Sequence, residues 1–365
     1  MNILIFLGHP AHFHLFRFTI QKLKEKSHRI TIVIKSKDVL EELLEEEKLH
    51  YLNIFSRERS NNKLDIVFSL LKRDKELLKI VKKEKPVLMI GTSSEIARVG
   101  KLKKIPSVIL NEDDAEAVMH FARFSYPFTN VILSPSCCDN GKWKRKSFFY
   151  NGYHELAYLH PNYFNPDIKK IKDLISNPDE KYFIIRLAKL TAHHDKDKRG
   201  IDKYITMKLV KKLSQVGKVY ITSERELEPE FESYRITIDP ILIHQAMAFA
   251  TLYIGDSQTM AAEAAVLGVP SIRFNDFVGK LGYLEELEHK YGLTFGIKTS
   301  EPEKLFNKID ELLSMPNLKE EWQKRRQKML ADKIDVTAFM VWFIENYPES
   351  VRVMREDPAC QYNFK

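Results

Sequence analysis

The sequence contains few cysteines and no long apolar run. Its cysteines are Cys137, Cys138 and Cys360, and two adjacent cysteines without a second pair exclude a disulfide framework and a cysteine-ligated zinc site. The amino terminus lacks the basic start of a secretory signal peptide. No uninterrupted apolar stretch approaches the ~18–20 residues of a membrane span. We therefore expect a cytoplasmic protein with reduced thiols, whose only membrane contact would be peripheral, at the inner face.

Three common catalytic motifs are also absent. The chain has no Gly-x-x-x-x-Gly-Lys, no Gly-x-Gly-x-x-Gly after its first apolar run and no Gly-x-Ser-x-Gly. These motifs cradle nucleotide phosphates or expose a nucleophilic serine. Their absence argues against an ATPase, a dinucleotide-dependent dehydrogenase and an α/β-hydrolase.

The chain is basic, and its charge suits an anionic partner. It carries a net charge of +8 over 365 residues, of which 44% are hydrophobic and 30% charged. Nucleic acid, acidic lipid headgroups and nucleotide phosphates all fit this balance. We expect no nucleic-acid partner, because the sequence has neither a recognisable binding module nor a basic stripe on one face. The run GKWKRKSFFYNGY (141–153) could contact acidic lipids, although a solvated loop is the alternative.

The order of the elements predicts an α/β fold with two Rossmann-like domains facing a cleft. Apolar runs that alternate with helical patterns are typical of a parallel sheet with helices on both faces. The pattern breaks at 150–167, which is rich in Asn, Pro and Tyr, and then restarts at 181–187. We expect strands at 2–8, 28–36, 50–56, 86–92, 105–113 and 130–135, then at 181–187, 218–223, 235–239, 251–254 and 270–274. The predicted domains are 1–160 and 161–334, with a helix and tail at 335–365 that pack back on the first domain.

The stretch GDSQTMAAEAAVLGVP (255–270) has the pattern of a strand end, a turn and a capped helix. Asp256 or Ser257 can cap the helix, and Gly268 followed by Pro270 ends it. The first turn, which holds Gln258 and Thr259, would present free amides and a partial positive charge to a phosphate. Glu263 could accept hydrogen bonds from ribose hydroxyls. The alternative is a helix whose glutamate only supports its dipole.

The stretch GHPAHFHLFRF (8–18) brings histidines to the carboxyl end of the first strand, where ligands of open α/β sheets bind. His12 or His14 can take a proton from a sugar hydroxyl, since imidazole titrates near neutral pH. The alternative is that they cap the helix or lie at the edge of the core. No carboxylate or cysteine lies at helical spacing beside them, so we expect no metal site.

Two further loops could contribute to a site. In RLAKLTAHHDKDKRG (186–200), Arg186, His193 and His194 could hold a diphosphate by charge-assisted hydrogen bonds, or the loop is only polar surface. In NEDD (111–114), Glu112 to Asp114 could supply a general base, although such acids more often form turns and caps.

These motifs resemble known families. The stretch 255–270 with the following SIRFND resembles the carboxyl-domain signature of non-hydrolysing UDP-N-acetylglucosamine 2-epimerases and B-type (GT-B) glycosyltransferases. More closely, HPAHFHLFR, YNGYHELAYLHPNYFNPD and AHHDKDKRG together resemble a prokaryotic family of unknown function with a predicted GT-B fold. This resemblance covers roughly residues 2–330.

The resemblance implies roles for particular residues. The Asp256–Ser257 turn would hold the diphosphate of UDP, Glu263 would bind the ribose, and Arg273 would lie near the sugar or phosphate. Gln258 and Thr259 replace the Gly-Gly usual after Asp-Ser, and Gly8-His9-Pro10-Ala11-His12 replaces the Gly-Thr-Arg-Pro-Glu of the epimerases. The neighbourhood of His193-His194-Asp195 replaces their His-Arg-x-Glu-Asn segment, so the chain has lost groups that the epimerases carry.

We therefore expect a metal-independent glycosyltransferase that moves sugar from a nucleotide sugar, UDP-linked, to a glycan or lipid-linked acceptor in polysaccharide or glycoconjugate synthesis. The first domain would hold the acceptor and the second the nucleotide sugar, with no separate cofactor. His12 would be the base, and His14 or Glu112 would stand in for it. The alternatives are an enzyme like the 2-epimerases and a non-catalytic protein that binds UDP-sugars.

Overall fold

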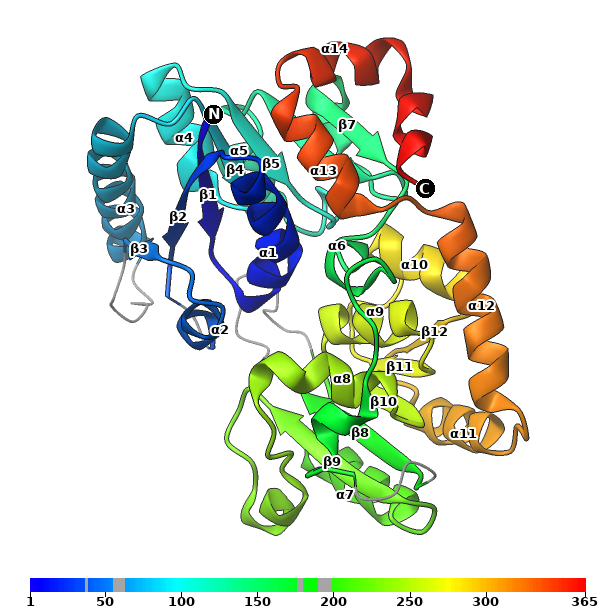
Figure 1. Cartoon of the computed structure of the whole chain (residues 1–365). Coiled ribbons are helices and arrows are strands. Elements are labelled where there is room, and N and C mark those ends of the chain that lie inside the picture. The colour runs from blue at the N-terminus through cyan, green and yellow to red at the C-terminus, as the bar shows by residue number, and fades with distance from the viewer. Residues whose placement is uncertain (37–38, 55–62, 176–179, 190–198) are drawn as a thin grey trace. The chain divides into compact units, whose positions relative to one another are not determined.

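The chain forms two compact units. The computed structural model describes residues 1–36, 39–54, 63–175, 180–189 and 199–365 (Figure 1). Unit 1 comprises Met1–Tyr163 and Ile334–Lys365, and unit 2 comprises Phe164–Lys333. Within the described ranges, the helices are all too short or too polar to cross a membrane.

The described part of unit 1 is built on a seven-stranded parallel sheet in the order β3-β2-β1-β4-β5-β6-β7. Its central strands are almost entirely apolar in their buried runs, with Ser107 of β5 as the polar residue, as expected for a sheet covered on both faces. The strands are β1 (Asn2–Leu7), β2 (Arg29–Ile34), β3 (Tyr51–Asn53), β4 (Leu88–Gly91), β5 (Ser107–Leu110), β6 (Val131–Pro135) and β7 (Ser147–Tyr150).

Helices cover both faces of this sheet. Helix α1 packs with α6 and α13, whereas α4 packs with α3 and α5. The helices of unit 1 are α1 (Pro10–Glu25), α2 (Leu40–Glu46), α3 (Lys63–Glu84), α4 (Ser94–Lys103), α5 (Met119–Ser125), α6 (Leu156–Leu159), α13 (Val336–Glu345) and α14 (Glu349–Glu356), with 3₁₀ turns η1 (Gly141–Lys146) and η5 (Pro358–Phe364). The predicted return of the carboxyl-terminal helix is confirmed: Glu345 of α13 accepts hydrogen bonds from Lys26 and His28, at 2.5 and 3.0 Å.

Unit 2 repeats this architecture on a smaller scale. Its described residues form a five-stranded parallel sheet in the order β12-β11-β10-β8-β9. The strands are β8 (Tyr182–Leu187), β9 (Lys218–Ser223), β10 (Leu252–Gly255), β11 (Ser271–Phe274) and β12 (Thr294–Ile297). The helices are α7 (Lys203–Leu213), α8 (Ile243–Ala248), α9 (Gln258–Leu267), α10 (Gly282–His289), α11 (Pro302–Leu313) and α12 (Leu318–Asp332), with 3₁₀ turns η2 (Ile168–Ile171), η3 (Pro229–Tyr234) and η4 (Pro240–Leu242).

The predicted α/β class with two Rossmann-like parallel sheets is confirmed. Three details differ. The predicted strand at 235–239 is reduced to one bridge between Ile221 and Arg235, because the chain then enters the 3₁₀ turn η4. Strand β12 was missed, since TFGI is short and contains glycine. Strand β7 was missed because it lies inside the basic run 141–153, of which only the first part is a surface turn.

A glycine lets strand β4 lie close to β1 at the point where both strands end. Gly91 has φ +155°, and an added Cβ would lie 2.5 Å from the Phe6 carbonyl oxygen. Gly141 also has positive φ, +52°, but an added Cβ there meets nothing within 4 Å. The two positions therefore separate the effect of backbone strain from that of a clash.

We predict that Gly91→Ala lowers the free energy of unfolding by about 3 kcal/mol or more, since it adds a clash with backbone to a strained φ. Gly141→Ala should cost only ~1 kcal/mol, the strain of a left-handed L-residue. Urea unfolding of the two variants measures both values. Equal losses would contradict the close approach of β4 to β1.

Candidate functional site

Each sheet has a point at which the strand order reverses. In unit 1 this switch point lies between β1 and β4, and in unit 2 it lies between β8 and β10. Open α/β sheets bind ligands beyond the carboxyl ends of their strands at such points. We therefore expect functional side chains at the carboxyl edges at β1/β4 and β8/β10.

Helix α9 begins at the switch point of unit 2, directly after β10. The side chain of Ser257 caps it by accepting the Met260 amide at 3.4 Å, and Gly268, with φ +73°, ends it. The buried alanines let α9 lie close to β11. Since the first amides of a helix have no intrahelical acceptor, those of Gln258 and Thr259 remain available at the carboxyl edge. The cap, the turn and the stop were all predicted.

Asp256 is a structural clamp, which corrects its expected role beside a diphosphate. Its carboxylate is 2% exposed and accepts the amides of Ala188 at 2.6 Å and Ile201 at 3.1 Å. It thereby joins the backbone that follows β8 to the backbone that precedes α7. Burial raises the pKa of Asp256 to about 6, although these amide bonds oppose the rise. A buried carboxylate held this way would repel a phosphate, so we leave it out of the binding site.

Gln258 carries an unpaired polar group at this edge. Within the described residues, both Oε1 and Nε2 of its side chain are buried and form no hydrogen bond. Buried amides in folded proteins are nearly always paired, and an unpaired one costs free energy. The unpaired amide stands in the first turn of α9, at the same place as the free backbone amides.

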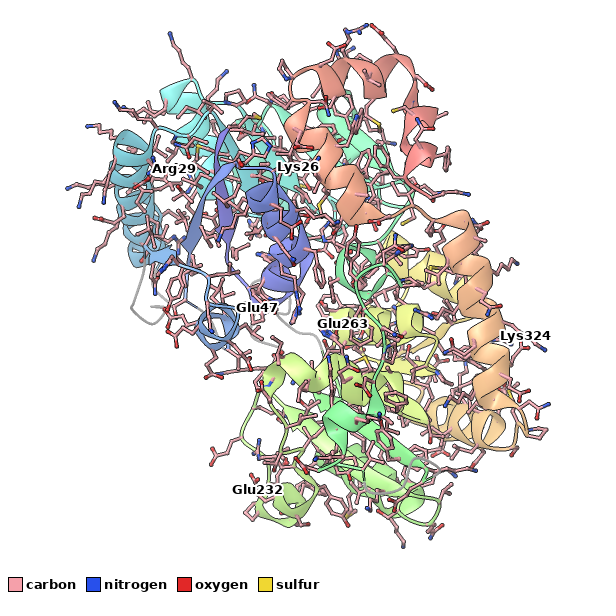
Figure 2. The ribbon with its side chains drawn as sticks, viewed as in Figure 1. Lys26, Arg29, Glu47, Glu232, Glu263 and Lys324 are labelled. Carbon is pink, nitrogen blue, oxygen red and sulfur yellow. The ribbon has the colours of Figure 1, made fainter. Side chains whose placement is uncertain are left out.

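Glu263, which is labelled in Figure 2, lies further along α9. It is paired with His244, which the sequence did not indicate as a site residue. His244 of α8 places Nε2 3.0 Å from Oε1 of Glu263, and both side chains are about 95% buried. The sequence does place a histidine at a buried position of a helix. It could not reveal the pair, because Glu263 lies 19 residues further along the chain and no local pattern joins the two residues. This pair fixes the glutamate carboxylate between two helices.

The cationic residues predicted for the diphosphate are dispersed. Arg186 donates to Thr222 at 2.8 Å and to Glu224, so its guanidinium is tied to β9 and the turn after it. Arg273 is 1% exposed and donates to Glu288 at 2.6 Å, and Glu288 also accepts the Gly296 amide. A guanidinium buried in this way is not available to a sugar or phosphate, so Arg273 does not belong to the site. His193 and His194 lie outside the described residues.

The carboxyl edge of unit 2 also has a cavity of about 540 Å³. Lys189, Arg199 and Arg225 supply positive charge to its wall and Asp202 supplies one negative charge, while Ile201 links it to the Asp256 clamp. A cavity of this size suits a ligand of nucleotide dimensions. Its charge would favour an anion.

In unit 1, His12 occupies the switch point as predicted. Its Nδ1 accepts the Gly8 amide at 3.1 Å, and the Thr92 hydroxyl, which follows β4, lies 2.6 Å from Nδ1 and 2.7 Å from Nε2. The Gly8 bond requires an unprotonated Nδ1, so a neutral ring carries its proton on Nε2. His9 caps α1 by accepting the Ala11 amide at 3.2 Å. The two histidines thus have different tasks.

His14 does not share this position. It is 6% exposed, and its ring contacts those of Phe13 and Tyr158 at centroid distances of 5.2 and 5.3 Å. Two residues along a helix turn a side chain by about 200°, which places His14 on the packed side of α1. It therefore fits the alternative of a histidine at the core.

The acidic turn after β5 holds a group with an unusual pKa. Burial, followed by the negative charge of Glu112, raises the pKa of Asp113 to about 7. Glu112 itself accepts the His154 amide at 3.2 Å, and its Oε1 lies 3.4 Å from His154 Nδ1. The sequence indicated this turn but could not show that Asp113 is the residue that titrates near neutrality, because burial depends on the tertiary structure. No group of three or more His, Cys, Asp or Glu in the described part of the chain is arranged to hold a metal.

The raised pKa of Asp256 leads to a pH-dependent stability. The folded value, about 6, lies above the ordinary 3.8, so the native state holds this proton more tightly and the stabilisation is lost as pH rises from about 4 to 6. We predict that the unfolding free energy of the native chain, minus that of Asp256→Asn, falls by up to about 3 kcal/mol between pH 4 and pH 7. Urea titrations of both proteins across this range measure it. A difference independent of pH would contradict the clamp as described.

Solved structures share this fold. S. aureus MnaA, solved with UDP, matches with a TM-score of 0.65 at 12% identity, covering 96% of this chain and 97% of that chain. The spinosyn rhamnosyltransferase SpnG with thymidine diphosphate matches at 0.64 and 13% identity, covering 94% and 100%. The UDP-GlcNAc 2-epimerase of Neisseria meningitidis with UDP-GlcNAc matches at 0.63 and 13% identity, covering 94% and 99%. Identities this low establish the fold alone, which is that of GT-B glycosyltransferases and UDP-GlcNAc 2-epimerases.

Sequence comparison identifies the family but supplies no activity. No curated protein sequence matches the chain significantly. One family profile matches residues 1–344, nearly the whole length. The chain therefore belongs to the family described as protein of unknown function, DUF354.

Proposed function

We propose that this protein is a nucleotide-sugar-dependent glycosyltransferase that binds a pyrimidine nucleoside diphosphate, UDP in the first instance, at the start of α9. The observation that carries the proposal is the coincidence of an unpaired buried amide, Gln258, with the free end of a helix at the switch point of unit 2. Related folds with UDP, UDP-GlcNAc and thymidine diphosphate in their structures support this ligand class.

The diphosphate would be bound by neutral donors and a helix dipole. The amides of Gln258 and Thr259 and the side-chain amide of Gln258 would donate to its oxygens. The Ser257 hydroxyl can add a further donor. As the bond from sugar to phosphate breaks, negative charge grows on the departing diphosphate, and fixed donors stabilise that charge without reorganising. Lys189 and Arg225 of the neighbouring cavity would add positive charge.

Glu263 would bind the ribose, and His244 would hold its carboxylate in place. The pair holds Oε1 of Glu263 by a hydrogen bond of 3.0 Å, and the carboxylate would accept a hydrogen bond from a ribose hydroxyl. A carboxylate positioned in this way discriminates ribose from deoxyribose, because the lost partner would leave buried charge unpaired.

The acceptor hydroxyl would lose its proton at the carboxyl edge of unit 1. His12 is the base expected from the sequence, but its Nδ1 already accepts the Gly8 amide. Asp113 has a pKa of about 7 and forms part of the acidic turn after β5. A carboxylate that titrates near the working pH is well matched to general base catalysis. We therefore assign Asp113 as the general base and His12 as a positioning residue. The acceptor would be a glycan or a lipid-linked sugar.

The proposed nucleotide site gives Gln258 and Glu263 different roles, one at the diphosphate and one at the ribose. Gln258→Ala should weaken UDP binding about tenfold and leave the preference for UDP over 2′-deoxy-UDP intact, since it removes a phosphate donor. Glu263→Gln should remove that preference. Isothermal titration calorimetry of the native chain and both variants with each nucleotide measures these affinities. The matched control is Glu311→Gln, at an exposed residue of α11. If neither variant alters UDP affinity, α9 does not bind the nucleotide.

The proton acceptor predicts the shape of a pH–rate profile. With a UDP-sugar donor and an accepted alcohol, the native rate should rise with pH to a plateau above about 7, as Asp113 ionises. Asp113→Asn should abolish this limb and lower the rate by 10²–10⁴-fold, whereas His12→Asn should keep the limb at a reduced rate. A limb lost in His12→Asn and kept in Asp113→Asn would restore His12 as the base. Conversion of UDP-GlcNAc without any acceptor, seen by NMR, would indicate epimerisation instead.

A further inference from the structure

The amino edge of the unit 1 sheet, opposite to the edge that holds His12, carries an unusual surface. It is formed by four segments that precede β4, β5, β6 and β7: residues 82–87, 101–104, 123–130 and 141–146. We call this the amino-edge surface. In Figure 1 it lies toward the end of the sheet where the chain begins.

Hydrogen bonds join the four segments to one another and to the neighbouring strands. Val87 donates its amide to Asn2 at the start of β1, and Met89 donates to Pro106 at the start of β5. The Asn130 amide donates to Ser107 at 3.2 Å. The Lys146 ammonium donates to the carbonyls of Tyr126, Pro127 and Thr129 at 2.9 to 3.2 Å. The end of α4 joins the surface through α5, with which α4 packs.

The amino-edge surface is strongly cationic. Within the four segments the acid is Glu84, which pairs with Arg29. Lys144 pairs at 3.2 Å with Asp139, whose carbonyl accepts the Ala115 amide next to the acidic turn after β5. The cations on these segments are Lys82, Lys83, Lys85, Lys101, Lys103, Lys104, Arg123, Lys142, Lys144, Arg145 and Lys146. Such an excess over one edge creates a positive potential that attracts an anionic surface.

Large apolar side chains project among these cations. Leu102 is 68% exposed, Val87 and Phe124 are 52% exposed, and Phe128 is 38% exposed. Exposed apolar groups that gather in one place on a soluble protein mark a contact surface. Leu102 lies between lysines in KLKK (101–104), and Val87 follows the lysines of KKEK (82–85). Phe124 and Phe128 follow Arg123 in RFSYPF (123–128).

We propose that the amino-edge surface docks unit 1 on an anionic lipid bilayer. The cations would lie among acidic headgroups, while Leu102, Phe124, Phe128 and Val87 enter the boundary of the acyl chains. Nucleic acid would also attract the cations, but leucine and valine cannot stack on bases, whereas acyl chains accept them. Docking at this edge leaves the carboxyl edge free, because the two lie at opposite ends of the strands.

Vesicle flotation of the full chain tests this surface. Vesicles of phosphatidylcholine with 30% phosphatidylserine should carry the protein, and vesicles of phosphatidylcholine alone should not. Lys101→Gln/Lys103→Gln/Lys104→Gln should weaken binding about 100-fold, at about fivefold for each lysine. The matched control is Lys319→Gln/Lys324→Gln/Lys328→Gln on α12, which removes the same charge from exposed positions of unit 2 and should bind as the native chain does. Lys324 is labelled in Figure 2.

A second variant isolates the apolar contribution. Leu102→Gln/Phe124→Gln keeps every charge and should weaken vesicle binding about 20-fold, with the residual binding more easily removed by salt. Equal binding by the native chain and both amino-edge variants would overturn the proposal, as would equal binding to neutral and anionic vesicles. A duplex oligonucleotide that binds at the same salt more tightly than the vesicles would identify a nucleic-acid surface instead. UDP calorimetry on the same variants should be unchanged, which separates this test from that of the nucleotide site.

Discussion

In a parallel sheet the chain must return to the amino edge after every strand, so each connection carries a helix or a long segment across the sheet. Both units obey this constraint in every strand pair described. Strand ends and helix starts consequently meet at the carboxyl edge, and helix ends and strand starts meet at the amino edge. The free amides of α9, the His12 ring and the acidic turn after β5 all lie at carboxyl edges for this reason, and the cationic ends of α3 and α4 lie at the opposite one.

Most of the buried charged side chains discussed here bind backbone or other side chains of their own unit, so they hold the fold in place and are not available to bind substrate. Asp256 holds two backbone amides, Arg273 holds Glu288, and Glu95 of α4 is paired with Arg73 at 2.7 Å and with Ser93. Burial alone would raise the pKa of Glu95, yet the charge of Arg73 and the Ser93 bond outweigh it and lower the value. A carboxylate that is fully used by the fold is a poor ligand for substrate. The polar groups that remain for chemistry are those whose donors or acceptors are not used by the fold, such as the side-chain amide of Gln258.

The proposed nucleotide binding and the proposed membrane docking depend on different physical interactions. The nucleotide site depends on a few short-range donors in fixed positions, whose strength is insensitive to salt when water is excluded. The amino-edge surface depends on many mobile cations and a few apolar side chains, and its electrostatic part fades over the Debye length. Because one edge is built from helix starts and the other from helix ends, the same fold supplies both environments without conflict.

The sequence by itself determined the class of fold, the two successive sheets and the capped helix at 258–267, because hydrophobic period, capping residues and glycine stops act over a few residues. Several site assignments needed the tertiary structure. Which carboxylate is a clamp (Asp256), which is paired with a distant histidine (Glu263) and which titrates near neutrality (Asp113) depends on burial and on partners far along the chain. Arg273 was misassigned for the same reason: its sequence context shows a cation after an apolar run, and only packing shows that Glu288 neutralises it inside the unit.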